Sequence, residues 1–235
     1  MNQQQFKQYL HEQKIEITSK QLKQFEKYYE ILVSYNENVN LTAITEKGEV
    51  YLKHFYDSLS PLLEYDIPAG ATLCDVGAGA GFPSIPIKIA RPDIKVVIID
   101  SLKKRIDFLN HLVEELSLED VVAIHARAEE YAEKARESFD VVTARAVARL
   151  NILSELCLPL VKVGGEFIAL KGSSGNEELE EARKAIKTLG GVCKQVLDFD
   201  LPLDGGNRTL IVVEKKQKTP LKYPRNFGQI KKRPL

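Results

Sequence analysis

A glycine-rich segment that follows a short apolar run carries the clearest chemical signal in this chain. The segment spans residues 73–83 and has the sequence LCDVGAGAGFP. Glycine lacks a Cβ atom, so a loop containing Gly77 and Gly79 can turn sharply and bring its backbone amides close to a ligand. A dinucleotide-binding loop would need a third glycine at the position of Phe82, and a P-loop would need a Lys-Ser or Lys-Thr pair. Neither requirement is met, so the segment predicts a different ligand, with Asp75 as a further contact before the loop.

Acidic residues follow at the ends of the next two apolar runs. Asp100 ends the run at 96–99, about 20 residues after the glycines, where a carboxylate commonly binds two ribose hydroxyls. Its alternative role is to cap the following helix. Ala128 and Glu129 follow the next run and are placed to border an adenine ring, although Glu129 could equally stabilise the first turn of a helix. These positions predict a ligand that contains a ribose and an adenine.

Basic residues end the two apolar runs after that. Arg145 lies in an otherwise apolar stretch, where burial without a partner would be costly. We expect it to contact a ligand carboxylate or a phosphate, with an internal salt bridge as the alternative. Lys171 precedes a GSSG segment and should lie on the same edge, either facing the substrate or as an ordinary solvated lysine.

The elements that must position these residues form an α/β pattern, in which apolar runs alternate with amphipathic stretches. Two late runs are joined by a short segment with the sequence DGGN, too short for a crossover helix, so they must form an antiparallel hairpin. We predict a doubly wound class I methyltransferase sheet of five parallel strands closed by this hairpin, with S-adenosylmethionine as the cofactor. The predicted strands are Thr72–Val76, Lys95–Ile99, Val121–His125, Phe139–Thr143, Glu166–Leu170, Val192–Phe199 and Leu210–Glu214.

The chain is predicted to have three parts. Residues 1–66 are an N-terminal helical extension, in which Thr18 or Ser19 caps one helix and Thr45 caps a second that runs from about Glu46 to near Pro61. Residues 67–215 form the S-adenosylmethionine-binding methyltransferase domain, and residues 216–235 form a basic C-terminal tail.

The absence of two motifs limits which atom can accept the methyl group. Enzymes that methylate exocyclic amines carry an Asn/Asp-Pro-Pro-aromatic segment at the fourth strand, whereas residues 140–146 read DVVTARA. No cysteine follows a proline or threonine, as attack on a pyrimidine carbon would favour, and Cys157 is predicted to lie in the core. Guanine N7 has a free lone pair on the major-groove edge of the base and needs no deprotonation. We therefore expect no catalytic general base, only alignment and electrostatics.

Charge is segregated along the chain. The net charge is zero, but residues 215–235 contain eight basic residues and no acidic one, which leaves 25 basic against 33 acidic residues in the rest. An arm that contacts RNA phosphates explains this better than a solubilising terminus. A structural strap that uses Leu221, Tyr223 and Phe227 is the alternative. Because the tail is remote from the glycine loop in the sequence, its removal is expected to spare cofactor binding. The predicted RNA contacts are His54, Lys171, Lys222, Arg225, Lys231, Lys232 and Arg233.

These residues together resemble the bacterial 16S ribosomal RNA (guanine-N7) methyltransferase G family, also called GidB. The resemblance implies cofactor contacts at Gly77, Phe82, Ala128, Glu129 and Arg145, and 16S rRNA presented within the small ribosomal subunit as the substrate. His54 and Asp57 share a helix face, and the resemblance favours a helix that borders the substrate cleft. The chain departs from many relatives at Asn38, where they carry lysine. The matching segments are 40–44, 54–58, 75–83, 127–129, 143–146 and 223–235.

Three other functions fit the sequence less well. An oxidoreductase with a nicotinamide cofactor is disfavoured by Phe82 and by the closing hairpin. A non-catalytic RNA-binding or ribosome-assembly factor has no need of the glycine loop with Asp75 and Asp100. Methylation of a small molecule is opposed by the basic tail.

Composition indicates an ordinary globular protein, with 44% hydrophobic and 28% charged residues. Cys74, Cys157 and Cys193 lie far apart, which disfavours a zinc site and favours free thiols in a reducing compartment. The start MNQQQ lacks the features of a signal peptide, and no apolar run has the length of a membrane span. We expect a cytoplasmic monomer that uses no metal and contacts no membrane.

Overall fold

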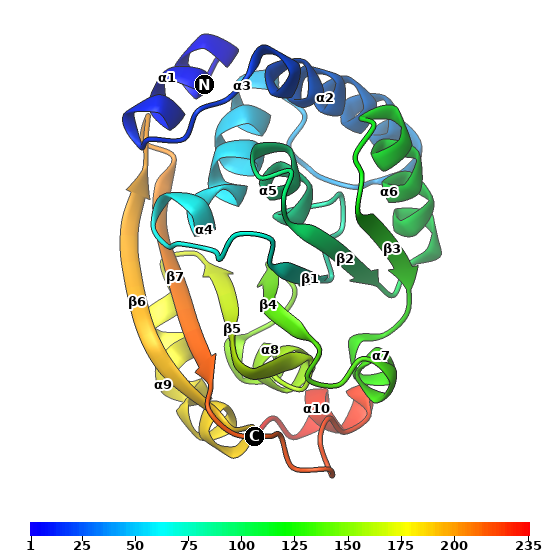
Figure 1. Cartoon of the computed structure of the whole chain (residues 1–235), viewed down its shortest axis with the longest axis vertical. Coiled ribbons are helices and arrows are strands. Elements are labelled where there is room, and N and C mark those ends of the chain that lie inside the picture. The colour runs from blue at the N-terminus through cyan, green and yellow to red at the C-terminus, as the bar shows by residue number, and fades with distance from the viewer.

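A seven-stranded sheet with the order β3-β2-β1-β4-β5-β7-β6 forms the centre of the molecule (Figure 1). The computed structural model describes residues 1–235. Neighbours among the first five strands are parallel, whereas β7 lies antiparallel between β5 and β6. The predicted fold class is therefore confirmed. The strands are β1 Thr72–Val76, β2 Lys95–Asp100, β3 Val121–His125, β4 Phe139–Arg145, β5 Val161–Lys171, β6 Gly191–Leu201 and β7 Gly206–Lys215.

Helices cover both faces of the sheet, because successive side chains of its central strands point to opposite sides. On β1, Leu73 packs into a core of 34 buried residues with α1, α2, η1, α5 and α6. Cys74 and Val76 pack into a second core of 26 buried residues with α7, α8, α9 and α10. The helices are α1 Gln3–Glu12, α2 Ser19–Val39, α3 Lys47–Glu49, η1 Val50–Tyr56, α4 Ser60–Leu63, α5 Ser84–Ala90, α6 Lys103–Glu115, α7 Ala128–Lys134, α8 Leu150–Cys157, α9 Gly175–Thr188 and α10 Phe227–Lys232.

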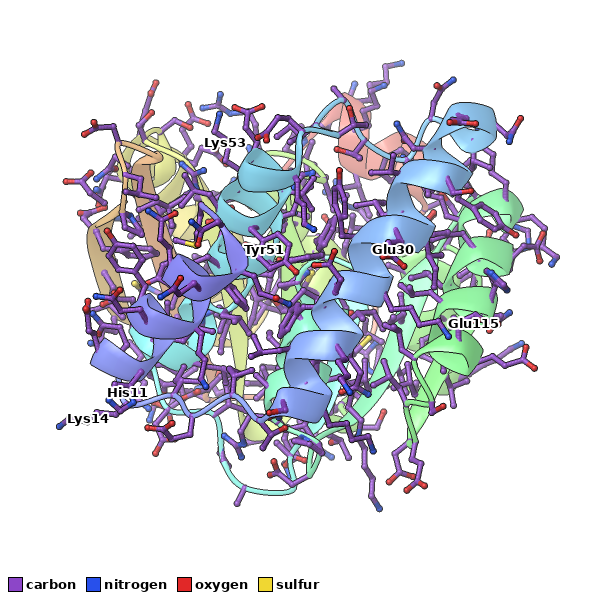
Figure 2. The ribbon with its side chains drawn as sticks, turned by 90° about the horizontal axis from the view of Figure 1, so that it is seen from above. His11, Lys14, Glu30, Tyr51, Lys53 and Glu115 are labelled. Carbon is purple, nitrogen blue, oxygen red and sulfur yellow. The ribbon has the colours of Figure 1, made fainter.

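The N-terminal helices share the first core with the sheet. Thr18, one of the two predicted caps, is the N-cap of α2. The Gln21 amide donates to Thr18 Oγ1 at 3.2 Å, and the Thr18 amide donates to Gln21 Oε1 at 2.8 Å. Figure 2 shows α2 passing between the helix that carries Tyr51 and Lys53 and α6, which ends at Glu115. In this position α2 packs against α5, which follows the glycine loop, and against α6.

The second predicted helix differs from expectation in its cap and in its type. Glu46, not Thr45, caps it, because the Glu46 carboxylate accepts from the amides of Gly48 and Glu49 at 2.9 and 2.7 Å. From Val50 to Tyr56 the chain is π-helical. A π-turn holds an extra residue and is often found at functional sites, because it redirects the side chains it carries.

The C-terminal tail is packed onto the domain. Tyr223 and Ile230 are buried, and Arg136 donates to the carbonyls of Thr219 and Tyr223 at 2.6 and 2.8 Å. The backbone of the tail therefore follows the strap alternative, although Leu221, which was expected to take part, is 92% exposed.

Lys215, at the start of this basic segment, is fully buried. Its ammonium donates to Leu158 O and Thr219 Oγ1 at 2.5 and 2.7 Å and lies 3.5 Å from the Glu137 carboxylate. Burial lowers the pKa of Lys215 to about 8, against the opposing effect of Glu137. This residue anchors the tail and is not available to RNA. None of the helices combines the length and apolar character that a membrane span requires.

Candidate active site

A cavity of about 460 Å³ opens at the carboxyl ends of β1, β2, β3 and β4, the edge at which open α/β sheets bind ligands. It is formed by strand ends, by the glycine loop and by the first turns of α6 and α7. Seven of the eight predicted cofactor contacts line it: Gly77, Gly79, Phe82, Asp100, Ala128, Glu129 and Arg145.

The glycines of the loop are required for two different reasons. All three have positive φ, at +74° for Gly77, +60° for Gly79 and +97° for Gly81. A Cβ on Gly77 would lie 2.7 Å from a methyl of Val147, and one on Gly81 would lie 2.9 Å from the Tyr28 hydroxyl. A Cβ on Gly79 would meet nothing within 4 Å. Gly79 therefore borders open space in the cavity, whereas the other two are demanded by packing.

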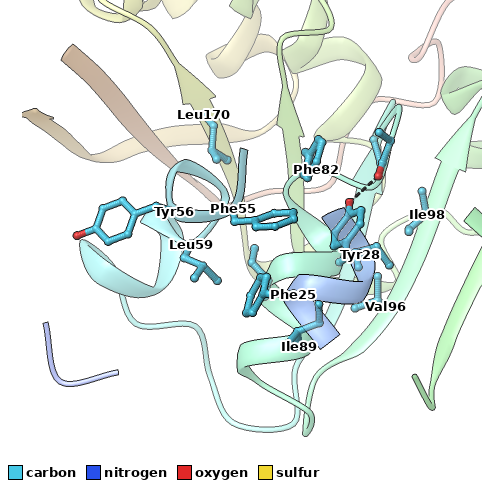
Figure 3. Close-up of a cluster of buried hydrophobic side chains, with 14 of the residues drawn as sticks. Phe25, Tyr28, Phe55, Tyr56, Leu59, Phe82, Ile89, Val96, Ile98 and Leu170 are labelled. Atoms are coloured by element: carbon cyan, nitrogen blue, oxygen red, sulfur yellow. Dashed lines mark hydrogen bonds between the residues drawn. The ribbon is translucent and has the colours of Figure 1, made fainter. Parts of the chain in front are cut away.

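Aromatic packing from the N-terminal helices supports the loop from below (Figure 3). The Tyr28 hydroxyl donates to the Ala80 carbonyl at 2.5 Å, and the Tyr28 ring stacks on Phe82 with centroids 5.5 Å apart. Phe55 of η1 packs against both rings. The helical extension thus fixes the conformation of the loop that lines the cavity.

Asp75 is placed differently from the prediction. Its side chain is fully buried behind the loop, does not line the cavity, and accepts a hydrogen bond from the Ser84 amide at 3.0 Å. Burial raises the pKa of Asp75 to about 7, the bonds from Ser84 opposing the effect. The carboxyl group holds the start of α5 against β1 instead of contacting the cavity.

Two other acids do line the cavity. Asp100 accepts from the amides of Gly79 and Leu102 at 3.1 and 2.9 Å, so it joins the tip of the glycine loop to the start of α6. Glu129 is 8% exposed and accepts no hydrogen bond; its nearest cation, Arg127, is 4.0 Å away. A carboxylate at the cavity wall that has no donor from the protein can accept from a ligand that brings an N–H group. These residues fit an adenosine-containing cofactor.

Arg145 and its partners separate the first cavity from a second one of about 580 Å³, and both cavities are lined by His54, Arg145, Ala146 and Val147. Arg145 Nη1 donates to Asp57 Oδ2 at 3.0 Å, which is the internal salt bridge named as the alternative. Asp57 Oδ1 also accepts from Arg208 Nε at 3.0 Å. A single carboxylate therefore joins two guanidinium groups at the junction.

His54 packs between this network and the glycine loop. Its ring stacks on Phe82 with centroids 4.5 Å apart, and its Nε2 lies 2.8 Å from Thr42 Oγ1. Burial, with a smaller contribution from Arg145, lowers the pKa of His54 to about 4. The imidazole is neutral at pH 7, so it cannot serve as a cationic contact for phosphate.

The predicted RNA contacts divide into two groups. Lys171 is buried and donates to Ala148 O at 2.7 Å while pairing with Glu178 at 2.7 Å, although it lines the second cavity. Arg225 pairs with Glu155, whose side chain is fully buried. Both have structural partners that the sequence did not reveal. The exposed members of the group are Lys222, Lys231, Lys232 and Arg233.

Sequence reasoning missed several lining residues. Arg208 lies in the hairpin and Thr42 in the segment between α2 and α3, and neither was predicted as a contact. Phe227, in the tail, also lines the cofactor cavity. The fold therefore brings one residue of the tail to the cavity that the glycine loop lines, although the tail is remote from that loop in the sequence; that removing the tail spares cofactor binding stays a prediction. No group of three or more His, Cys, Asp or Glu side chains is placed to hold a metal ion.

Residues 21–206 match the model of the family described as rRNA small subunit methyltransferase G. The ribosomal RNA small subunit methyltransferases G of Bacillus thuringiensis (strain Al Hakam) and Bacillus cereus (strain B4264) are each 56% identical over 237 residues, which cover 100% of this chain and 99% of the relative. The chain belongs to this family. Membership confirms the predicted resemblance and the prediction of an S-adenosylmethionine-dependent methyltransferase.

Solved structures share the fold at low sequence identity. TrmN from Thermus thermophilus superposes with a TM-score of 0.55 at 17% identity, over 70% of this chain and 53% of that one. A chain from the complex between the Haloferax volcanii Trm112 methyltransferase activator and the putative methyltransferase gives a TM-score of 0.58 at 14% identity, over 79% and 98%. At this identity the likeness supports the class I methyltransferase fold alone.

Proposed function

We propose that this protein transfers the methyl group of S-adenosylmethionine to N7 of a guanine in 16S ribosomal RNA of the small subunit. The observation that carries the proposal is the pair of adjoining cavities with a shared wall at His54 and Arg145. The first has the glycine loop and two acids, and its volume lies in the usual range for small-molecule sites. The second adjoins it, and eight of its 14 lining residues have charged or imidazole side chains, which suits the acceptor nucleotide.

Residues of the first cavity would each hold one part of the cofactor. Asp100 would accept from the ribose hydroxyls, and Glu129 would accept from the exocyclic amine of adenine beside Ala128. Arg145 Nη1 donates to Asp57 and to the Lys53 carbonyl, and Nη2 lies 3.3 Å from His54 Nδ1. The Nε–H group and the second Nη2 hydrogen would remain to donate to the methionine carboxylate. When bound, the cofactor supplies a methyl group activated by its sulfonium centre.

The acceptor side needs orientation and no proton transfer. Guanine N7 carries its lone pair in the ring plane, so alignment with the methyl group is sufficient for reaction. The residues at the junction agree with this requirement, because His54 is bonded to Thr42 and stacked on Phe82, and Asp57 is held between two arginines. Neither is placed as a free base.

The exposed basic residues near the cavities provide the contact with RNA phosphates. Lys231, Lys232 and Arg233 lie at the end of α10, whose first residue, Phe227, lines the cofactor cavity. Cations there would neutralise the phosphates that flank the target base. We place the protein in the cytoplasm as a monomer that acts on 16S rRNA within the small subunit.

The experiment is methyl transfer to small subunits from a strain that lacks this gene. The protein is incubated with methyl-labelled S-adenosylmethionine and either intact subunits or the free 16S rRNA, and the labelled nucleoside is identified after digestion. Label in 7-methylguanosine supports the proposal. Label in any other nucleoside, or in neither RNA, contradicts it.

A further inference from the structure

The C-terminal segment, residues 219–235, contributes one residue, Phe227, to the lining of the cofactor cavity. Phe227 lines this cavity together with Arg127, Ala128 and Glu129. The guanidinium carbon of Arg127 lies 5.8 Å from the centroid of the Phe227 ring. Phe227 is therefore next to the start of α7, which is the part of the cavity assigned above to adenine.

The ring is held there by anchors on both sides of it in the sequence. Before it, Arg225 makes three hydrogen bonds to Glu155 of α8: from the backbone amide at 2.9 Å, from Nε at 2.8 Å and from Nη2 at 2.6 Å. After it, Ile230 is fully buried in the second core. Asn226 caps the short helix by accepting from the Gln229 amide at 3.0 Å. Phe227 thus belongs to a fixed wall, although most of its neighbours in the sequence are exposed.

Phe227 itself is only partly buried, while Tyr223 and Ile230 fill the core beneath it. A partly exposed aromatic ring on a fixed segment, beside a cavity that takes a nucleoside, has the form of a stacking platform. Offset or edge contacts between an aromatic side chain and a base contribute favourably to the free energy of binding, because every base has a π-face.

We propose that Phe227 stacks on the adenine ring of S-adenosylmethionine, which makes the C-terminal segment part of the cofactor site. This inference rests on the proposed placement of adenine beside Ala128 and Glu129. It assigns the segment a function inside the cavity in addition to any contact of its outer lysines with RNA.

The test is calorimetric titration of the full-length protein with two ligands. S-adenosylhomocysteine contains the whole cofactor except the methyl group, and 5′-methylthioadenosine contains the adenosine half without the amino acid. Phe227→Ala should weaken both ligands by the same factor, about tenfold or more for a lost base–aromatic contact. Phe227→Tyr should bind both ligands as the wild type does.

Two further variants separate stacking from packing. Leu221→Ala changes an exposed apolar residue of the same segment and should leave both affinities unchanged. Phe227→Leu keeps apolar bulk without the ring, so its thermal melt should match the wild type while its affinity for both ligands stays reduced. This variant decides the matter if Phe227→Ala proves unstable.

Each result bears on the proposal in one direction. Wild-type affinity in Phe227→Ala or Phe227→Leu would overturn it. A loss for S-adenosylhomocysteine with none for 5′-methylthioadenosine would also overturn it, because Phe227 would then act at the methionine end. If the wild type binds neither ligand, the proposed function fails first. If the wild type binds both ligands and Phe227→Ala binds them with the same affinity, the stacking proposal is rejected and the proposed function stands.

Discussion

Replacing Asp75 with asparagine tests how burial controls the charge behind the glycine loop. Burial raises the pKa of this carboxyl group from its ordinary value of 3.8 to about 7. The folded protein therefore keeps the proton over a range in which the unfolded chain has released it. The stabilisation from this group is fully present below pH 3.8 and is lost as pH rises through about 7.

The size of the effect follows from the shift. Each pKa unit corresponds to about 1.4 kcal/mol, so a rise of about three units gives a loss of about 4 kcal/mol between acidic pH and pH 8. Asparagine has nearly the same shape, carries no charge, and can still accept from the Ser84 amide. Asp75→Asn should therefore become more stable relative to the wild type as pH rises from 4 to 8.

The assay is urea unfolding of both proteins without cofactor at several pH values. The difference between their free energies of unfolding should grow with pH over this range and level off above it, and cofactor affinity should stay close to that of the wild type. A difference that is constant with pH would refute the assigned burial effect. A large loss of cofactor affinity in a variant that stays folded would instead support the direct contact between Asp75 and the cofactor that the sequence predicts.

Three more predictions follow from particular contacts. Gly79→Leu should abolish S-adenosylhomocysteine binding in calorimetry, whereas Gly70→Leu should retain it because Gly70 lies outside the cavity. Gly70 has a similar φ of +67° and also has nothing within 4 Å of an added Cβ, so equal effects would mean that backbone strain alone is responsible. In urea unfolding, Lys171→Met should lower the free energy of unfolding by about 3–5 kcal/mol, because the buried Glu178 carboxylate loses its cationic partner. Adding Glu178→Gln should recover part of this loss, and no recovery would contradict the pairing. Neutralising Lys231, Lys232 and Arg233 should flatten the slope of log affinity for RNA against log salt by roughly 0.7–0.9 per lost contact, without changing the thermal melt. Neutralising the exposed Lys20 and Lys23 of α2 should leave the slope unchanged, and equal slopes in both variants would show that the tail does not contact RNA.

The sheet could be predicted from sequence because its signals are local. The runs at 72–76 and 121–125 match β1 and β3 residue for residue, and Thr18, one of the two caps predicted for the first N-terminal helix with a predicted cap, caps α2. The loop of the hairpin was also too short for any arrangement other than an antiparallel pair. Each of these depends on residues a few positions apart.

Most features that the sequence did not reveal depend on contacts between distant residues. The π-helix at 50–56 changes the direction of side chains without changing the apolar pattern, so periodicity did not reveal it. Arg225 looked free because its partner, Glu155, belongs to α8. Phe227 looked remote from the glycine loop because only the folded tail brings it to the cavity. Local patterns therefore located the cofactor loop but not the wall that closes it.

The central claim, direct methyl transfer to guanine N7, is tested most directly by removing the acceptor atom. A 16S rRNA transcript made with 7-deazaguanosine, in which a C–H group replaces N7, is assembled into small subunits beside a transcript made with guanosine. The account predicts that both subunits bind the protein and that labelled methyl enters only the guanosine-containing RNA. Methyl incorporation into the 7-deazaguanosine RNA would contradict it.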